Sequence, residues 1–387
     1  MKYDFTTEAA PRGTNSFKWD LRPELLPMWV AEMDFPVAPF IVEAVRKRVE
    51  KGVFGYTFVP DSYYECVKKW FGSRYDWQID KDQIIPISGI VPATSITIKA
   101  LTEPGDKVVF MTPAYNCFFR NITNTGAVQN PSELVWNSSL QRYEVDWPDF
   151  EARIADPASK VFLLCNPHNP CGRLWSREEL ERMGNICLKY GVPVISDEIH
   201  CEIVAPGSSY LPFATLFPQN CITFVSPTKP FSMPGLKIAN IISANEDLLA
   251  KVKHIIGLWE HGNVNQLGIV ALQAAYSPEG AEWLDEMNEV VHANFLDLRE
   301  RFAAEFPSVR VATLEATYLA WLDFAPLGLG GKQIQDHLLE HQKLWINAGD
   351  IYGDPSCMRM NLACPRTTLQ RGLDLYIKGI KELLASS

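Results

Sequence analysis

Residues 161–200, VFLLCNPHNPCGRLWSREELERMGNICLKYGVPVISDEIH, contain two short apolar runs with a helical pattern between them. The runs VFLLC and VPVIS are almost continuously apolar, which favours strands whose two faces are both covered. Between them, Ser176 and Glu179 have the spacing of a capping box, and Gly191 follows the last helical residue. A strand, a helix and a second strand in this order predict an α/β unit with parallel strands.

Further apolar runs lie on both sides of this unit and have the same character. We predict that they form buried parallel strands of the same sheet; they are residues 107–113, 221–227 and 237–244.

The pattern changes from about residue 286 onward. A long helical pattern over 280–306 leads to the alternating stretch TYLAWLDF (317–324), which predicts an antiparallel strand with one solvent-facing side. Residues 366–384 again have a helical pattern. We therefore predict an α/β fold with a large domain at 46–285 and a smaller α+β domain formed by 1–45 and 286–387.

Composition narrows the class of protein. The chain has 387 residues, of which 47% are hydrophobic, and a net charge of −10, which argues against nucleic acid or an anionic membrane as a partner. It has no run of 18 apolar residues that would indicate a membrane span. Its nine cysteines include no CxxC pair, so neither a metal site nor a disulfide framework is indicated. These features predict a cytoplasmic protein.

Functional side chains in open α/β sheets gather at the carboxyl ends of the strands. Gly89 follows the apolar run IIPI and opens a helical stretch, which predicts a phosphate site or an ordinary turn. Tyr115 follows KVVFMT and could stack on a planar ring or simply pack. Asn169 lies in the turn-rich NPHNPCG after VFLLC and could donate to a phenolate-like oxygen. In the same turn, His168 suits a structural loop role better than a ligand or base.

Two further strand ends carry charged residues. Asp197 ends the run PVIS, where a carboxylate would pair with a pyridinium nitrogen or cap a helix. Lys229 follows ITFVSPT and precedes a loop rich in proline and glycine, which suits an amine that forms a Schiff base better than a solvated surface lysine. Together, the five strand ends could supply a phosphate-binding turn, an aromatic residue that stacks on a ring, a hydrogen-bond donor to an oxygen, an acid and an amine.

With these residues the chain resembles the fold-type-I pyridoxal 5′-phosphate (PLP) enzymes of the aminotransferase class I/II superfamily. Within them it is similar to the MalY/PatB-type cystathionine β-lyases. The resemblance implies a large domain with a mostly parallel seven-stranded sheet and a smaller α+β domain. Its markers are RGTNSFKWD (12–20), LPMWVAEMDFP (26–36), FGYT (54–57), SGIVPA (88–93), NPHNPCGR (166–173), SDEIH (196–200) and RMNLACPR (359–366).

The resemblance implies a role for each residue around the cofactor ring. Lys229 matches the Schiff-base lysine, which also moves the Cα proton, and Asp197 matches the acid that pairs with the ring nitrogen. Asn169 matches the residue that hydrogen-bonds the cofactor's O3′ oxygen, and His200 takes the place beside the same oxygen. Tyr115 is similar to the aromatic residue that stacks on the ring.

The resemblance also implies how the phosphate is held. The backbone amides of Ile90 and Val91, with the Ser226 hydroxyl, match the phosphate cradle. Lys237 matches a phosphate-binding cation. Tyr56 resembles a tyrosine that reaches the phosphate bound by the neighbouring subunit, which implies a homodimer with shared sites.

The reaction is less closely specified than the cofactor. Arg359 matches the arginine that binds the substrate α-carboxylate. The leading prediction is β-elimination of cystathionine or another cysteine S-conjugate to a thiol, pyruvate and ammonia. Transamination of an α-amino acid is the alternative, and a non-enzymatic binding protein on the same scaffold is a third. Pro230 after the lysine and a short stretch at 349–359 depart from the family pattern and bear on this choice. No GxGxxG follows a strand, which disfavours a dinucleotide-binding enzyme.

Overall fold

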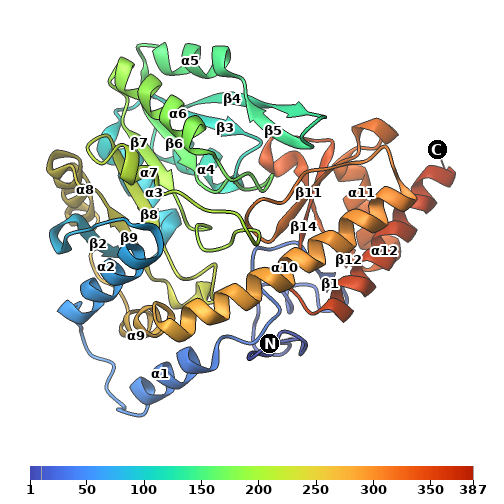
Figure 1. The fold of residues 1–387 in the computed structure, drawn as a ribbon, viewed down its shortest axis with the longest axis horizontal. Coiled ribbons are helices and arrows are strands. Elements are labelled where there is room, and N and C mark those ends of the chain that lie inside the picture. The colour runs from blue at the N-terminus through green and yellow to red at the C-terminus, as the bar shows by residue number, and fades with distance from the viewer. Residues whose placement is uncertain (10, 387) are drawn as a thin grey trace.

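The computed structural model describes residues 1–9 and 11–386 and is built on a central eight-stranded sheet (Figure 1). The predicted α/β architecture is confirmed. Seven strands were expected, and the eighth arises because a hairpin adds one more strand at the sheet edge. In sheet order the strands are β2 (Ile84–Ile87), β9 (Ala239–Ile242), β8 (Cys221–Val225), β7 (Val194–Asp197), β6 (Ser159–Cys165), β3 (Lys107–Thr112), β4 (Val128–Asn137) and β5 (Arg142–Val145).

The direction of one strand differs from its prediction. β3, β4, β6, β7 and β8 are parallel, but β9 pairs antiparallel with both β2 and β8. The prediction of a parallel strand within 237–244 is therefore wrong. The connection from β8 to β9 contains only the 3-10 turn Pro234–Leu236, whereas a parallel pair normally needs a crossover helix. Since β2 is antiparallel to β9, it runs in the same direction as β8, and the carboxyl ends of six strands meet at one edge. Five of these strand ends carry the residues singled out in the sequence.

Helices cover both faces of this sheet. Side chains alternate along a strand, so in β3 Val109 packs with one group of helices and Val108 and Phe110 pack with the other. On the Val109 side lie α5 (Trp147–Ala155), α6 (Arg177–Tyr190) and α7 (Phe213–Leu216); on the other lie α3 (Ile90–Leu101), α4 (Asn116–Asn124) and α8 (Glu246–Leu258).

The capping box predicted for α6 is present. The Ser176 hydroxyl accepts a hydrogen bond from the Glu179 amide at 3.2 Å, and the Glu179 carboxylate accepts from the Ser176 amide at 2.8 Å. Gly191 follows the helix with φ 68°, a left-handed conformation that favours glycine.

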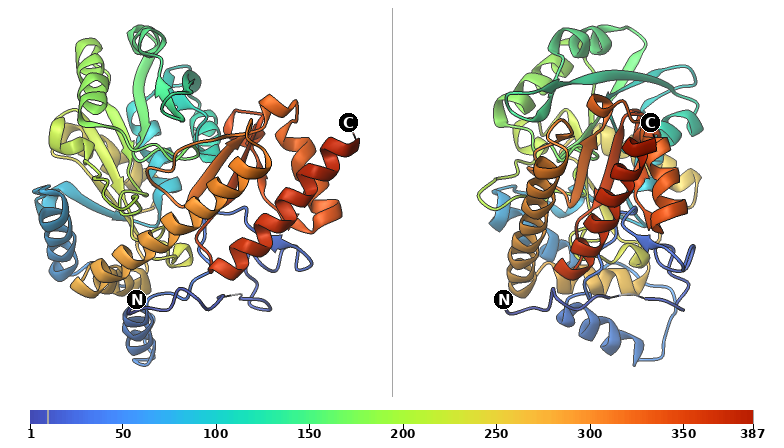
Figure 2. Two further views of the ribbon diagram at one scale, coloured as in Figure 1. Left: turned by 45° about the vertical axis from the view of Figure 1, so that its right-hand side comes forward. Right: turned by 90° about the vertical axis from the view of Figure 1, so that its right-hand side faces the viewer.

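A second, antiparallel sheet follows in the chain. Its order is β10 (Arg310–Val311), β11 (Leu319–Asp323), β14 (Cys357–Asn361) and β13 (Asn347–Ala348). The helices α10 (Pro278–Glu305) and α12 (Arg366–Ser386) lie side by side along it (Figure 2).

An antiparallel strand within 317–324 is confirmed, but its predicted solvent-facing side is wrong because all five residues of β11 are buried. On one side Phe302 of α10 and Tyr376 of α12 pack around Phe324. On the other, the Trp321 indole donates to the Tyr143 hydroxyl in β5 at 3.3 Å. Packing against the large sheet therefore covers the face that the alternation suggested was wet.

The N-terminal segment joins the two parts of the fold. β1 (Leu26–Pro27) pairs in parallel with β12 (Leu344–Trp345), and α1 (Pro39–Val49) packs on α9 (Gln266–Ala275). Two further helices are α2 (Asp61–Tyr75) and α11 (Gly331–His337). The domain boundaries at 46 and 285 stay a prediction; α10 runs unbroken past the second of them.

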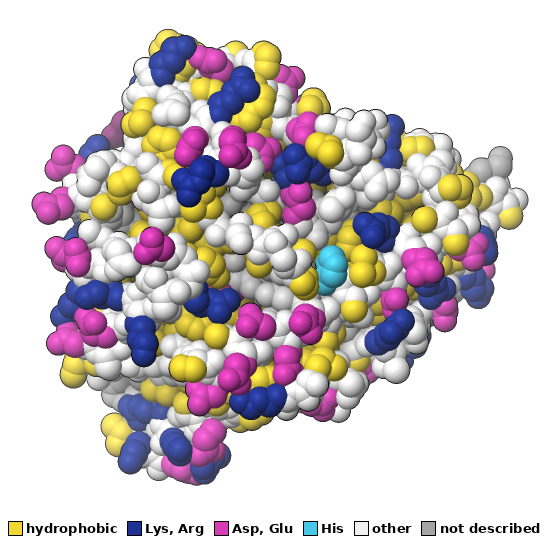
Figure 3. Space-filling model, viewed as in Figure 1, with side chains coloured by type: hydrophobic (Ala, Val, Ile, Leu, Met, Phe, Trp, Pro, Cys, Tyr) yellow, Lys and Arg dark blue, Asp and Glu magenta, His cyan; other side chains and the backbone are white. Residues whose placement is uncertain are grey.

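Basic and acidic side chains alternate over the face of the molecule seen in Figure 3, and no extended single-sign area is visible on that face. In the part of the chain that the structure describes, no helix combines the length and apolar character needed to cross a membrane.

Candidate active site

A cavity of about 760 Å³ lies at the carboxyl ends of the parallel strands. Its wall combines strand ends of the large sheet with Arg359 from β14 and with part of the N-terminal segment, including Trp29 and Ala31. The sequence-predicted residues that line it are Ile90, Val91, Tyr115, Asn169, Asp197, His200, Lys229, Lys237 and Arg359. Ser226 and Tyr56 do not line it.

The Lys229 amine lies inside the cavity. Its Nζ donates a hydrogen bond to the Ala31 carbonyl oxygen at 2.6 Å. Burial, together with the positive charge of Arg359, lowers the pKa of Lys229 to about 8. A lysine with this pKa has a substantial neutral fraction near pH 8, which is the nucleophilic and basic form of an amine.

Asp197 ends β7 and is buried. Its Oδ1 accepts a hydrogen bond from the Ile199 amide at 3.2 Å. Burial raises the pKa of Asp197 to about 7, against the lowering effects of that amide and of the Lys229 charge. A buried carboxylate so sparsely supported would be stabilised in its charged form by a cation in the cavity.

His200 is also buried, and its Nδ1 has no hydrogen-bond partner in the described chain. Burial lowers the pKa of His200 to about 3, and the charges of Lys229 and Arg359 act in the same direction. The imidazole is therefore neutral at physiological pH, with its ring packed edge-on against Tyr318.

Arg359 is buried without any carboxylate at ion-pair distance among the described residues. One guanidinium nitrogen donates to Asn169 Oδ1 at 3.0 Å, a second donates to the Trp29 carbonyl at 3.2 Å, and its Nε has no partner. The Tyr352 ring lies 4.4 Å from the guanidinium carbon. Because Asn169 accepts through its oxygen, its amide NH₂ group is left to donate.

The turn before α3 has the features of an anion site. Gly89 precedes the helix with φ 125°, a conformation that favours glycine, and no side chain caps the first turn. The first amides of a helix, here those of Ile90 and Val91, lack intrahelical acceptors and lie at the positive end of the helix dipole. Lys237 supplies a cation to the same cavity.

Two predicted residues lie elsewhere. The Ser226 hydroxyl is buried in the turn after β8, where it donates to the Ile238 carbonyl at 2.7 Å and accepts from the Thr228 amide at 3.1 Å. Thr228, to which no role was assigned, lines the cavity instead. Tyr56 is fully exposed on a segment without helix or strand. His168 is a structural loop residue, as expected, with Nε2 2.7 Å from the Pro113 carbonyl oxygen.

Sequence reasoning missed an aromatic part of the wall. Trp29 stacks on Trp345 with ring centroids 4.3 Å apart, Phe17 packs on Trp29 at 5.3 Å, and both Phe17 and Trp29 line the cavity. Phe17 lies in RGTNSFKWD (12–20) and Trp29 in LPMWVAEMDFP (26–36), two markers of the family resemblance, and this was the signal that could have indicated them. The pairing of β1 with β12 is what places them over the strand ends.

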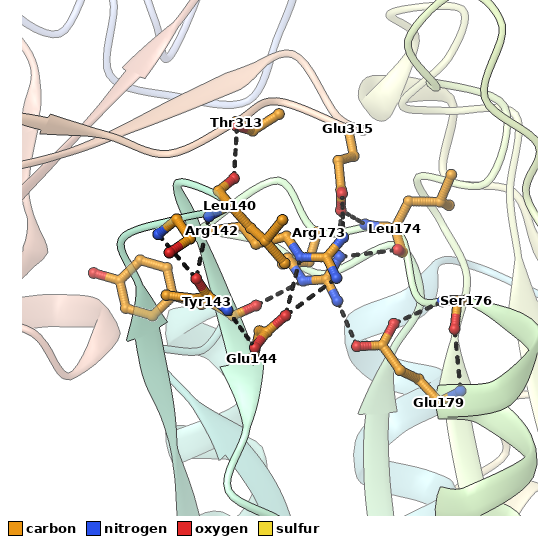
Figure 4. A network of polar contacts seen from close by, with 12 residues as sticks. Leu140, Arg142, Tyr143, Glu144, Arg173, Leu174, Ser176, Glu179, Thr313 and Glu315 are labelled. Atoms are coloured by element: carbon orange, nitrogen blue, oxygen red, sulfur yellow. Dashed lines mark hydrogen bonds and ion pairs between the residues drawn. The ribbon is translucent and has the colours of Figure 1, made fainter.

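A polar network fixes the loop that carries Asn169 (Figure 4). Arg173, whose side chain is completely buried, pairs with Glu315 at 2.5 Å and with Glu179 at 2.6 Å. Glu315 also accepts from Arg142 at 3.0 Å. The network thus connects the loop after β6 with β5, α6 and the segment before β11.

Comparisons with known proteins agree with this geometry. The family model described as "Aminotransferase class I and II" matches residues 25–375. The chain belongs to this family. Among curated class I and II relatives, it is 37% identical to cystathionine beta-lyase PatB of Bacillus subtilis, covering 93% of this chain and 95% of that protein. It is 32% identical to protein MalY of Escherichia coli, covering 98% and 99%. The predicted resemblance is confirmed.

Two solved structures are similar to this chain in fold along nearly its whole length. Cystalysin from Treponema denticola, described as containing a PLP cofactor, superposes with a TM-score of 0.94 at 32% identity and covers 99% of this chain and 100% of its own. The PLP-bound C-S lyase from Staphylococcus hominis gives 0.91 at 31% identity, with 98% of each chain covered.

Proposed function

We propose that this protein is a PLP-dependent carbon–sulfur β-lyase that converts cystathionine or another cysteine S-conjugate to a thiol, pyruvate and ammonia. The main support for the proposal is that three groups line one cavity: the amine of Lys229 with its lowered pKa, the buried carboxyl of Asp197, and the buried Arg359 without a carboxylate partner among the described residues. Relatives named as cystathionine and C-S lyases that match this chain along nearly its whole length favour the lyase reaction over others of the family.

The residues of the cavity fit PLP. Asp197 offers a buried carboxylate for a protonated ring nitrogen, and Tyr115 offers an aromatic face. The first turn of α3 and Lys237 suit a phosphate, and Lys229 is the amine to which the cofactor would be attached. When bound, PLP supplies an aldehyde that bonds to amines and an electron-poor ring that stabilises negative charge at the substrate Cα.

The protein's own residues would then perform three tasks. Arg359 binds the substrate α-carboxylate through its free Nε and a neighbouring terminal nitrogen of the guanidinium group. The hydrogen bond to Asn169 keeps the guanidinium oriented. The neutral Nζ of Lys229 takes the proton from the substrate Cα. The electron pair of that C–H bond becomes the Cα=Cβ double bond as the thiolate leaves from Cβ, and water converts the released enamine to pyruvate and ammonia.

The test uses purified protein supplied with PLP, L-cystathionine and no keto acid. Steady pyruvate release over many turnovers, abolished in Lys229→Ala, supports the lyase. The alternative is an aminotransferase, which the family as a whole includes. In that case no pyruvate forms, the cofactor converts once to its amine form, and a keto acid is needed to restore it. That result would replace the proposed reaction.

A homodimer with shared sites is part of the proposal. The segment 51–59 has no helix or strand, and its large side chains face solvent in the single chain: Val53, Phe54, Tyr56 and Phe58 are 63%, 62%, 107% and 81% exposed. Apolar exposure on this scale favours burial against a partner. We expect sedimentation at twice the monomer mass, and we expect Tyr56→Ala to weaken PLP binding without lowering the stability of the monomer fold. A monomeric species with full PLP affinity would contradict this.

The proposed location is the cytoplasm. All nine cysteines are free thiols, and eight of them are buried. Reduced cysteines are typical of compartments in which thiols are kept reduced. Fractionation of the source cells, with the enzyme followed by antibody, would test the assignment.

A further inference from the structure

The cavity contains more positive charge than the proposed reaction needs. Its described wall contains four cationic side chains, Arg120, Lys229, Lys237 and Arg359, and one acidic side chain, Asp197. This local excess occurs in a chain whose net charge is −10. In the proposed function, Lys229 carries the cofactor, Lys237 faces its phosphate and Arg359 binds the α-carboxylate. The proposed function assigns no role to Arg120.

Arg120 is held at the cavity by a fixed element. It lies on α4, whose N-cap residue is Tyr115, and the strand end before this helix is tied to the opposite wall because the Ala114 amide donates to the Tyr352 carbonyl at 2.8 Å. In the described chain, no carboxylate lies at ion-pair distance from Arg120. Its one recorded polar contact is from a terminal nitrogen to the Cys117 sulfur at 3.5 Å.

This position shares a cavity with the reacting amine. The Cys117 thiol, which the Arg120 guanidinium contacts, also lines the cavity, as does Lys229. The Arg120 guanidinium and the amine of Lys229 therefore face the same space. A cysteine S-conjugate whose α-carboxylate is bound by Arg359 extends its sulfur substituent into this cavity. Arg120 is the cation of the described cavity wall that has no role in the proposed reaction.

We propose that Arg120 binds an acidic group at the far end of the sulfur substituent, so that the enzyme prefers cysteine S-conjugates with a distal carboxylate. This inference rests on the proposed lyase function. A distal ammonium has no comparable partner, because Asp197 is the acidic residue on the described wall and is committed to the cofactor. Glu32, whose charge also raises the pKa of Lys229, is not part of that wall. The expected order of substrates is acidic, then neutral, then basic.

The test compares three L-cysteine derivatives of similar length on the holoenzyme: S-(2-carboxyethyl), S-propyl and S-(2-aminoethyl). Wild type should have a kcat/KM roughly threefold to fivefold higher for the acid than for the propyl compound, the size expected for one ion pair with an exposed arginine. Arg120→Gln should raise KM for the acid by about the same factor at unchanged kcat, with the propyl compound affected less than about twofold. Arg120→Lys should restore part of the preference.

Arg177→Gln is the matched control, because Arg177 is an exposed arginine on α6 that does not line the cavity. It should leave the ratio of acid to propyl substrate unchanged. The same ratio in wild type and Arg120→Gln, or an equal loss on all three compounds, overturns the inference.

Failure of the lyase proposal can be distinguished from failure of this inference. If wild type releases no pyruvate from any of the compounds, their dissociation constants are measured from the change in cofactor absorbance. An acid-over-propyl preference in binding that Arg120→Gln removes would still support Arg120 as the distal-acid site. Equal affinities would overturn it.

Discussion

The replacement Glu315→Gln tests whether the network of Figure 4 stabilises the loop that carries Asn169. The Glu315 carboxylate accepts from Arg173 at 2.5 Å, from the Leu174 amide at 3.0 Å and from Arg142 at 3.0 Å. A glutamine has the same shape but no charge, and its NH₂ group would face one of these donors. The Arg173 side chain is fully buried, so it cannot recover the lost interaction from water.

The expected loss in the free energy of unfolding is about 2–4 kcal/mol. Removing one partner of a buried ion pair costs about 3–5 kcal/mol, and the loss is smaller here because Glu179 still pairs with Arg173. The matched control is Glu144→Gln. Glu144 pairs with Arg142 at 3.2 Å where both side chains are about a third exposed, and such pairs contribute below about 1 kcal/mol.

Thermal scanning of both variants measures the difference. For a chain of this size, the apparent unfolding temperature should fall by several degrees in Glu315→Gln and by about one degree or less in Glu144→Gln. Because Asn169 lies in the loop fixed by Arg173, substrate KM should also rise in the first variant. Equal temperature shifts in the two variants would refute the argument that burial makes the Arg173 pair important.

Three further results are expected. Asp197→Asn should lower kcat by about 100-fold or more and shift the cofactor absorbance, since a neutral amide cannot stabilise a protonated ring nitrogen; activity and spectrum near those of wild type would contradict the role. The lowered pKa of Lys229 keeps more of its amine neutral at a given pH, so the rate of PLP incorporation into apoprotein should rise with pH, reach half its maximum near pH 8 and level off above about pH 9; a rise continuing beyond about pH 10 would indicate an ordinary lysine. Gly184→Ala should destabilise the fold by about 1–3 kcal/mol, because a Cβ there would overlap the Phe217 ring, whereas the helical control Gly257→Ala has open space around its Cβ and should be neutral or stabilising in the same thermal scan.

Local patterns in the sequence were sufficient for much of this fold. Ser176 and Glu179 predicted the start of α6, because a capping box depends only on neighbouring residues. Lys229, Asp197 and Asn169 could be placed together because each follows an apolar run, and parallel strands bring their carboxyl ends to one edge. The direction of β9 was not predictable in the same way, since an apolar run reports burial and not the sense of the strand.

Other parts of the site depend on contacts between distant residues. Lys229 meets the carbonyl of Ala31, 198 positions away, and Arg359 meets that of Trp29, 330 positions away. No periodicity in the chain encodes such pairings, because they arise when β1 joins β12 and brings the N-terminal segment over the sheet. Local patterns in the chain were enough to predict the buried strands, the main helices and the chemistry at the strand ends. Which remote segments close the cavity became visible only in the folded molecule, because helical and strand periodicities record local geometry, whereas that closure depends on how whole elements pack.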